Sequence, residues 1–145
     1  MILTPTLSAY RFPFAYVAFG GNPTHWWTKF LKKGFYHCLL IMGNGFDWIL
    51  IDPIWNYTDL IFIRNQNLPH IIKEKGYRLL RTTPHLIITQ KGHFRPLTCV
   101  EIVKRFLGIS NPKIWTPYQL FKFILSKKVK LSLTFDFFCD IILFS

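Results

Sequence analysis

Short apolar segments separated by turn residues recur along the chain. The two clearest, 35–42 and 46–52, flank the turn sequence Gly43-Asn44-Gly45. An Asn-Gly pair between apolar runs is the strongest short-range signal of a β-hairpin with a two-residue type I′ turn. We therefore predict two antiparallel strands joined at Asn44-Gly45. Similar patterns predict further strands at 11–21, 60–63, 77–81, 85–90 and 129–137.

A helical pattern opens at Thr98 and ends at Gly108. Thr98 and Glu101 form a capping box, in which each side chain satisfies a backbone N–H of the first turn. Apolar residues then recur at helical spacing, and Gly108 stands where a helix end favours a positive φ. Helices combined with a largely antiparallel sheet predict a single α+β domain over residues 1–145. Further helices are predicted at 24–33, 69–75 and 116–126.

The predicted hairpin brings a histidine to an aspartate. If Asn44-Gly45 is the turn, counting outward places His37 directly opposite Asp52. Directly opposed residues share a face, with Cβ atoms ~4.5–5.5 Å apart, so an imidazole–carboxylate pair is expected. A slip of one residue would set His37 opposite Ile51 and remove the pair. The neighbouring Cys38 points to the other face of the strand and is not expected to meet His37.

The capping box places Cys99 at the first position of its helix. Unpaired N–H groups and the helix dipole favour negative charge there, and the thiolate is the nucleophilic form of cysteine. The dipole contributes only ~0.3–1 kcal/mol, which is less than the ~1.4 kcal/mol of one pKa unit. Activation of Cys99 therefore requires a basic partner. His37, oriented by Asp52, is the candidate base.

The composition is that of a globular protein with a basic surface. Half of the 145 residues are hydrophobic and 18% are aromatic, and 18 Lys and Arg against 7 Asp and Glu give a formal charge of +11. This excess favours anionic partners: nucleic acid, a membrane surface, acidic wall polymers or acidic proteins. The three cysteines form no Cys-x-x-Cys pair, which argues against a disulfide framework and a zinc ribbon. We expect no secretory signal and no transmembrane segment, and therefore the cytoplasm or another reducing compartment.

Two segments resemble a known family. They are Gly34-Phe35-Tyr36-His37-Cys38, on a predicted strand, and residues 97–104, at a helix start. A strand histidine, a polar partner on the next strand and a later cysteine at a helix N-terminus resemble the circularly permuted, NlpC-like branch of the papain-like cysteine hydrolases. The resemblance covers about 34–126 and implies a permuted papain-like core. An apolar C-terminal extension, 129–145, has no counterpart in it.

The resemblance implies hydrolysis or transfer at amide, thioester or ester bonds, often in peptides of the cell wall. The triad carries onto Cys99, His37 and Asp52. Candidate substrate contacts are Trp48, Arg95 and His93, although for Arg95 and His93 a solvated loop position is the simpler interpretation. No cofactor is expected.

Other interpretations remain open. A cysteine on a helix is usually a small buried hydrophobe, and a strand histidine is usually a structural residue. Metal binding by His37, His93 and Cys99 lacks a recognised ligand spacing, so no metal is expected. A non-catalytic basic module that binds nucleic acid or an assembly partner is the main alternative. A third is a structural subunit whose C-terminal strand extends a neighbour's sheet.

Overall fold

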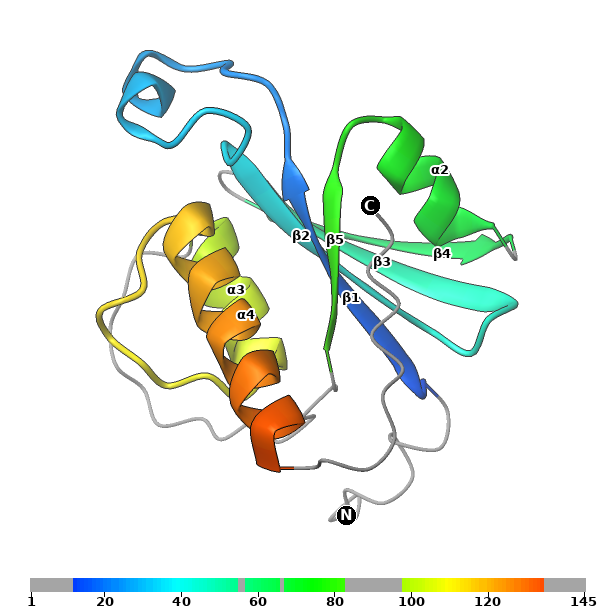
Figure 1. Ribbon diagram of the computed structural model, residues 1–145. Coiled ribbons are helices and arrows are strands. Elements are labelled where there is room, and N and C mark those ends of the chain that lie inside the picture. The colour runs from blue at the N-terminus through cyan, green and yellow to red at the C-terminus, as the bar shows by residue number, and fades with distance from the viewer. Residues whose placement is uncertain (1–11, 55–56, 66, 83–97, 135–145) are drawn as a thin grey trace, which may run out of the picture.

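Five antiparallel strands form one sheet in the order β4-β3-β2-β1-β5 (Figure 1). The computed structural model describes residues 12–54, 57–65, 67–82 and 98–134, with side chains described up to residue 128. Every neighbouring pair of strands is antiparallel. The strands are β1 (Phe14–Gly20), β2 (His37–Gly43), β3 (Asp47–Ile54), β4 (Tyr57–Arg64) and β5 (Arg78–Thr82).

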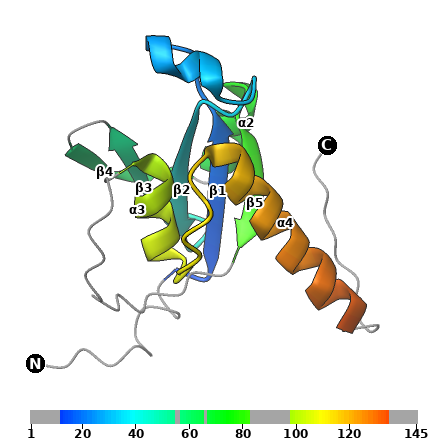
Figure 2. The same ribbon diagram turned by 90° about the vertical axis from the view of Figure 1, so that its left-hand side faces the viewer.

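Helices cover both faces of the sheet. Helix α2 (Leu68–Glu74) lies on one face, and α3 (Cys99–Phe106) and α4 (Pro117–Thr134) lie on the other, as Figures 1 and 2 show. Helix α3 packs on β2 and β3, whereas α4 packs on β1 and β5. A short 3₁₀ helix, η1 (Trp26–Phe30), lies in the connection from β1 to β2 and projects beyond the sheet. The described residues therefore have the predicted α+β class, with an antiparallel sheet and packed helices.

Strand alternation divides the core into two clusters. Cys38, Leu40 and Met42 of β2 point toward α3 and α4, while Leu39 and Ile41 point toward α2. Successive side chains of a strand face opposite sides, so continuous apolar runs are needed where both faces are covered. Helix α3 contributes Val100 and Val103 to the first cluster, and α4 contributes Leu120 and Ile124; both clusters exclude water from the centre of the sheet.

Most of the predicted elements are present. The strands at 11–21, 60–63 and 77–81 correspond to β1, β4 and β5, and the helix at 69–75 corresponds to α2. Of the predicted helix at 24–33, only η1 forms. The predicted strand at 85–90 lies outside the described residues.

The predicted strand at 129–137 is wrong over its described part, because α4 continues to Thr134. No Gly or Pro interrupts the chain after Pro117, and Leu and Lys, which favour helices, are frequent up to Leu133. The helix therefore continues through a segment whose alternation resembles that of a strand. The predicted extension 129–145 thus begins inside α4, and residues 135–145 lie outside the described residues.

Candidate active site

The β2–β3 hairpin turns one residue later than its sequence predicts. The Asn44 N–H donates to the Asp47 carbonyl at 3.1 Å, and the two central turn residues are Gly45 and Phe46. Gly45 has a φ of 98°, which suits the first central position of a type II′ turn. The Asn44 Oδ1 also accepts from the Asp47 N–H at 2.8 Å, which holds the turn in place. The two-residue loop is confirmed, but its predicted position is wrong.

Moving the turn by one residue moves the strand register by two. Gly43 pairs with Trp48 and Leu40 pairs with Ile51. This register, continued to the start of β2, sets His37 two residues away from its predicted partner Asp52. A shift of two preserves the face of every side chain, and diagonal cross-strand neighbours remain within reach of long side chains. The His37 Nε2 and the Asp52 Oδ1 accordingly lie 2.6 Å apart.

The candidate nucleophile, Cys99, is the first residue of α3. Thr98 is the N-cap, and its Oγ1 accepts from the Glu101 N–H at 3.3 Å, as the capping box predicts. The remaining N–H groups of the first turn have no partner within the helix, so they leave positive potential beside the sulfur. The half-buried Cys99 packs against the cluster that contains Cys38. Helix α3 therefore brings its N-terminal sulfur to the start of β2.

The Cys38 thiol and the His37 imidazole both act on the pKa of Cys99. A hydrogen bond with the Cys38 thiol is the strongest influence that lowers the pKa of Cys99 to about 5, against an ordinary 9.0. Burial opposes this shift, while the hydrogen bond and positive charge of His37 and a hydrogen bond from the Cys38 backbone support it. Complete burial raises the pKa of Cys38 well above its ordinary value, so Cys38 keeps its proton and donates it.

His37 carries the complementary charge. Burial is the largest single influence and would lower its pKa. Hydrogen bonds to Asp52 and Cys99, together with their negative charges, outweigh burial and raise the pKa of His37 to about 9. Between these two pKa values, Cys99 is a thiolate and His37 an imidazolium. Such an ion pair is an established way to activate cysteine, because the thiolate is formed without a prior proton transfer.

Cys38 influences Cys99 although the sequence pattern did not assign it to the candidate site. Strand alternation points its side chain away from His37, so the pattern predicts no contact with the His37–Asp52 pair. That same alternation places it on the face that α3 covers, where it meets Cys99. Two features of the sequence together indicate this position: the alternation of side chains along the strand, and the amphipathic helix that begins at Cys99.

Of the predicted substrate contacts, Trp48 lies within the described residues and does not join the Cys99 site. Trp48 is only 3% exposed and packs among the α2-side core residues, so its prediction as a substrate contact is wrong. It lies opposite Gly43 near the hairpin turn, at the other end of the paired region from His37. Arg95 and His93 lie outside the described residues.

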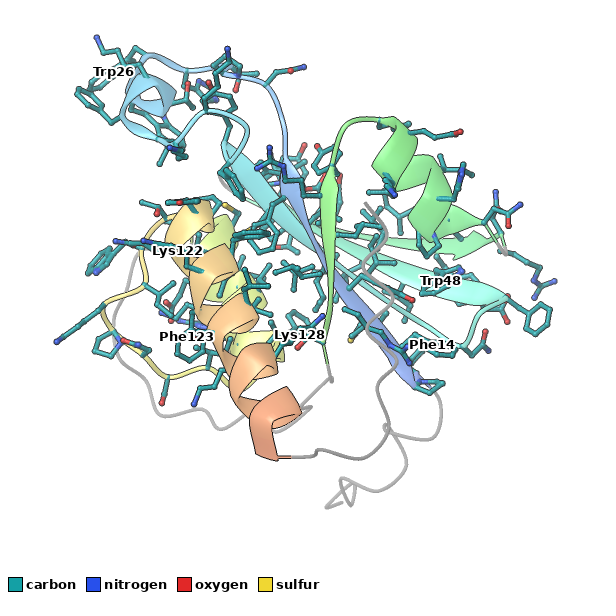
Figure 3. The ribbon with its side chains drawn as sticks, viewed as in Figure 1. Phe14, Trp26, Trp48, Lys122, Phe123 and Lys128 are labelled. Atoms are coloured by element: carbon teal, nitrogen blue, oxygen red, sulfur yellow. The ribbon has the colours of Figure 1, made fainter. Side chains whose placement is uncertain are left out.

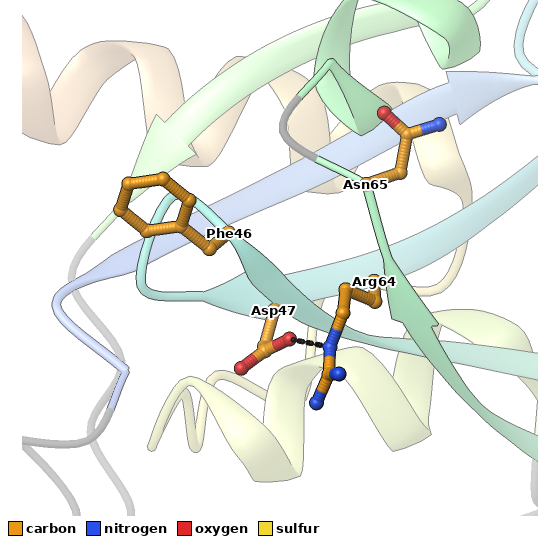
Figure 4. Close-up of a pocket in the computed structure, with 4 residues that line it drawn as sticks. All are labelled: Phe46, Asp47, Arg64 and Asn65. Atoms are coloured by element: carbon orange, nitrogen blue, oxygen red, sulfur yellow. Dashed lines mark hydrogen bonds and ion pairs between the residues drawn. The ribbon is translucent and has the colours of Figure 1, made fainter.

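A surface hollow lies elsewhere on the molecule. Phe46, Asp47, Arg64 and Asn65 line a volume of about 340 Å³ beside the hairpin turn (Figure 4). It contains an exposed Asp47–Arg64 ion pair of 3.1 Å but no nucleophilic side chain. Asp47 begins β3 and Asp52 stands five residues further along it, about 17 Å away at the rise of a strand. The hollow is therefore separate from the Cys99 site.

Two further findings bear on cofactors and partners. Within the described ranges, no group of three or more His, Cys, Asp or Glu side chains could hold a metal ion. No helix in that same part of the chain is long and apolar enough to cross a membrane.

Comparisons with protein families, curated proteins and solved structures place no known protein beside this chain. No family model matches the sequence, and no curated protein or solved structure is significantly similar to it.

Proposed function

We propose that the chain is a cysteine-dependent hydrolase that cleaves an amide bond through Cys99, His37 and Asp52. The observation that carries the proposal is the 2.6 Å contact between His37 and Asp52 beside a cysteine whose pKa is lowered to about 5. A structural cysteine has no need of a lowered pKa, and such shifts concentrate at reactive sites. Cys99 at the start of α3 and His37 at the start of β2 supply the residue types of a nucleophile and its base.

The proposed reaction has two steps. The Cys99 thiolate attacks the substrate carbonyl, the C–N bond breaks, and the His37 imidazolium gives its proton to the leaving amine. This leaves a thioester between the acyl group and Cys99. His37 then takes a proton from water, the resulting hydroxide attacks the thioester, and the acid and the thiolate are released. The backbone N–H of Cys99 is the candidate donor to the oxyanion in both steps.

Asp52 has a positioning role in this scheme. Its carboxylate accepts from the His37 ring at Nε2, which leaves Nδ1 as the nitrogen available for proton transfer. The negative charge of Asp52 also stabilises the imidazolium. Cys38 supports the thiolate by hydrogen bonding and takes no part in the bond changes.

The substrate class rests on the resemblance to the permuted NlpC-like hydrolases. It favours peptide amides, with cell-wall peptides as the first class to test. A catalytic thiolate has to remain reduced, which supports a reducing compartment. The formal charge of +11 supports an acidic substrate or an anionic surface as partner.

A panel of peptide amides, peptidoglycan fragments, thioesters and activated esters tests the proposal. The purified protein should hydrolyse at least one class, Cys99→Ala should abolish turnover, and Asp52→Asn should reduce it by about tenfold or more. His70→Ala is the matched control, because His70 also pairs with a carboxylate, Glu74 at 3.5 Å, but lies on α2. Turnover that persists in Cys99→Ala, or no turnover of any class by the unmodified protein, would contradict the proposal.

A further inference from the structure

The connection between β1 and β2 presents exposed aromatic side chains. We call residues 21–34 the aromatic loop. Trp26 and Phe30, both in η1, are each 76% exposed, the highest values among large hydrophobic side chains of the described residues. Figure 3 shows Trp26 at the far end of the loop, away from the sheet and helices. Exposed apolar side chains that lie together, rather than scattered singly, often mark an interaction site.

Hydrogen bonds fix the shape of the loop tip. Thr28 is only 3% exposed, and its hydroxyl and N–H both donate to the His25 carbonyl, at 2.5 and 3.0 Å. The Leu31 N–H in turn donates to the Thr28 carbonyl at 2.9 Å. Trp26 and Phe30 therefore project together, with ring centroids 6.5 Å apart and planes at 84°. A preformed tip loses little conformational entropy when it binds.

Lysines surround this aromatic tip. Lys29, Lys32 and Lys33 are all exposed, and residues 1–46 contain no Asp or Glu. The Lys29 Nζ lies 5.5 Å from the Phe30 ring centre. In the described structure, the ion pairs of Asp47, Asp52, Glu74 and Glu101 are with Arg64, His37, His70, Lys104 and Arg105 rather than with these lysines.

Helix α4 adds a further cation on the same side. Lys32 and Lys122 both lie over the Tyr118 ring, at 5.5 and 4.9 Å from its centre. Figure 3 places Lys122 on α4, below the loop. The aromatic tip thus stands above a base of exposed ammonium groups.

We infer that the aromatic loop docks the protein on the surface of an anionic lipid bilayer. Trp and Phe side chains enter the boundary between headgroups and acyl chains, and Trp is enriched there because its ring has both an apolar body and an N–H. Flanking lysines then contact anionic headgroups, each with a favourable contribution. The loop supplies both parts in one segment.

The shape of the tip favours a bilayer over a nucleic acid. Proteins that bind single strands use a basic groove in which bases stack on open aromatic faces. Here the two rings meet edge to face at the end of a projection, so they form a convex wedge instead of a stacking platform.

Docking would also orient the candidate active site. Gly20, at the end of β1, pairs with His37, and the Tyr36 N–H donates to the Gly20 carbonyl at 3.0 Å. Both ends of the aromatic loop therefore adjoin His37, so a docked loop holds this end of the sheet near the bilayer. The inference does not depend on hydrolase activity.

Vesicle flotation tests the inference with the full chain. Vesicles of equal parts phosphatidylglycerol and phosphatidylcholine should carry the protein, whereas pure phosphatidylcholine vesicles should not. Trp26→Ala/Phe30→Ala should lower the partition coefficient by about tenfold or more, because it removes the inserted surface. Lys29→Ser/Lys33→Ser should lower it by a similar factor and weaken its salt dependence.

Matched variants separate the loop from the rest of the surface. Phe46→Ala/Trp115→Ala removes two side chains that are each 61% exposed, and Lys75→Ser/Lys113→Ser removes the same charge from outside the loop. The aromatic control should bind like the unmodified chain, and the lysine control should lose less than the loop variant. Binding that falls equally in loop and control variants would overturn the inference. Failure of the unmodified chain to float with anionic vesicles would also overturn it. That outcome includes the case in which the loop variants lose binding to single-stranded RNA, or lose self-association, instead.

Discussion

Replacing Cys38 with alanine removes the strongest hydrogen bond to the Cys99 thiolate. A hydrogen bond to a charged group contributes ~1.5–3 kcal/mol, and one pKa unit corresponds to ~1.4 kcal/mol. The pKa of Cys99, about 5 in the unmodified chain, should therefore rise by about one to two units. Because a thiolate reacts and a thiol does not, alkylation near pH 6 should slow in Cys38→Ala and recover as the pH rises.

Cys38→Ser is the matched control, since a hydroxyl retains the donor at the same position. Its Cys99 pKa should stay close to that of the unmodified chain. The assay is the rate of iodoacetamide alkylation against pH, with the modified residue identified by peptide mass. Circular dichroism should show that both variants fold, because Cys38→Ala deletes only one buried sulfur. An unchanged pKa in Cys38→Ala, or an equal rise in both variants, would refute the role assigned to Cys38.

Three further substitutions test the contacts that hold the site and the fold. Asp52→Asn should lower the pKa of His37 by at least about one unit, because it removes a carboxylate 2.6 Å away. NMR titration of the imidazole C–H signals measures this pKa, and a value that stays near 9 would contradict the prediction. Gly43→Ala should lower the free energy of unfolding, measured by denaturant, by about 2 kcal/mol, because the added Cβ would lie 2.3 Å from the Trp48 ring. An unchanged free energy of unfolding would show that the hairpin adapts freely. Lys104→Met should lower the free energy of unfolding by about 3 kcal/mol in the same assay, because Lys104 is 1% exposed and donates to Glu101 at 2.9 Å. An unchanged free energy of unfolding would mean that the buried ion pair contributes no net stability.

Local signals predicted much of the fold. Apolar runs, turn residues and capping boxes act over a few residues, and they located the hairpin strands and the starts of α3 and α4. The helix predicted at 116–126 begins with a capping box of Thr116 and Gln119: the Gln119 N–H donates to the Thr116 Oγ1 at 3.2 Å, and the Gln119 Oε1 accepts from the Thr116 N–H at 3.1 Å. Interactions of this range are encoded in adjacent residues, so one sequence suffices to find them.

Features set by tertiary packing were harder to predict. The sequence favours a turn at Asn44-Gly45, yet the structure turns at Gly45 and Phe46. The predicted His37–Asp52 pair exists because a shift of two residues preserves strand faces. The role of Cys38 depended on which helix covers which face of the sheet, and a strand pattern alone does not contain that information.

The pH dependence of Cys99 alkylation, compared between the unmodified chain and His37→Ala, tests the central claim most directly. Cys38 must be retained, so the site of modification is identified by peptide mass. In the unmodified chain, the rate should rise with a pKa of about 5 and remain high at neutral pH, where His37 carries its proton. In His37→Ala, loss of the hydrogen bond and the positive charge should move the pKa of Cys99 back toward 9.0. A Cys99 that titrates like a free thiol in both proteins, or with the same low pKa in both, would contradict activation by His37.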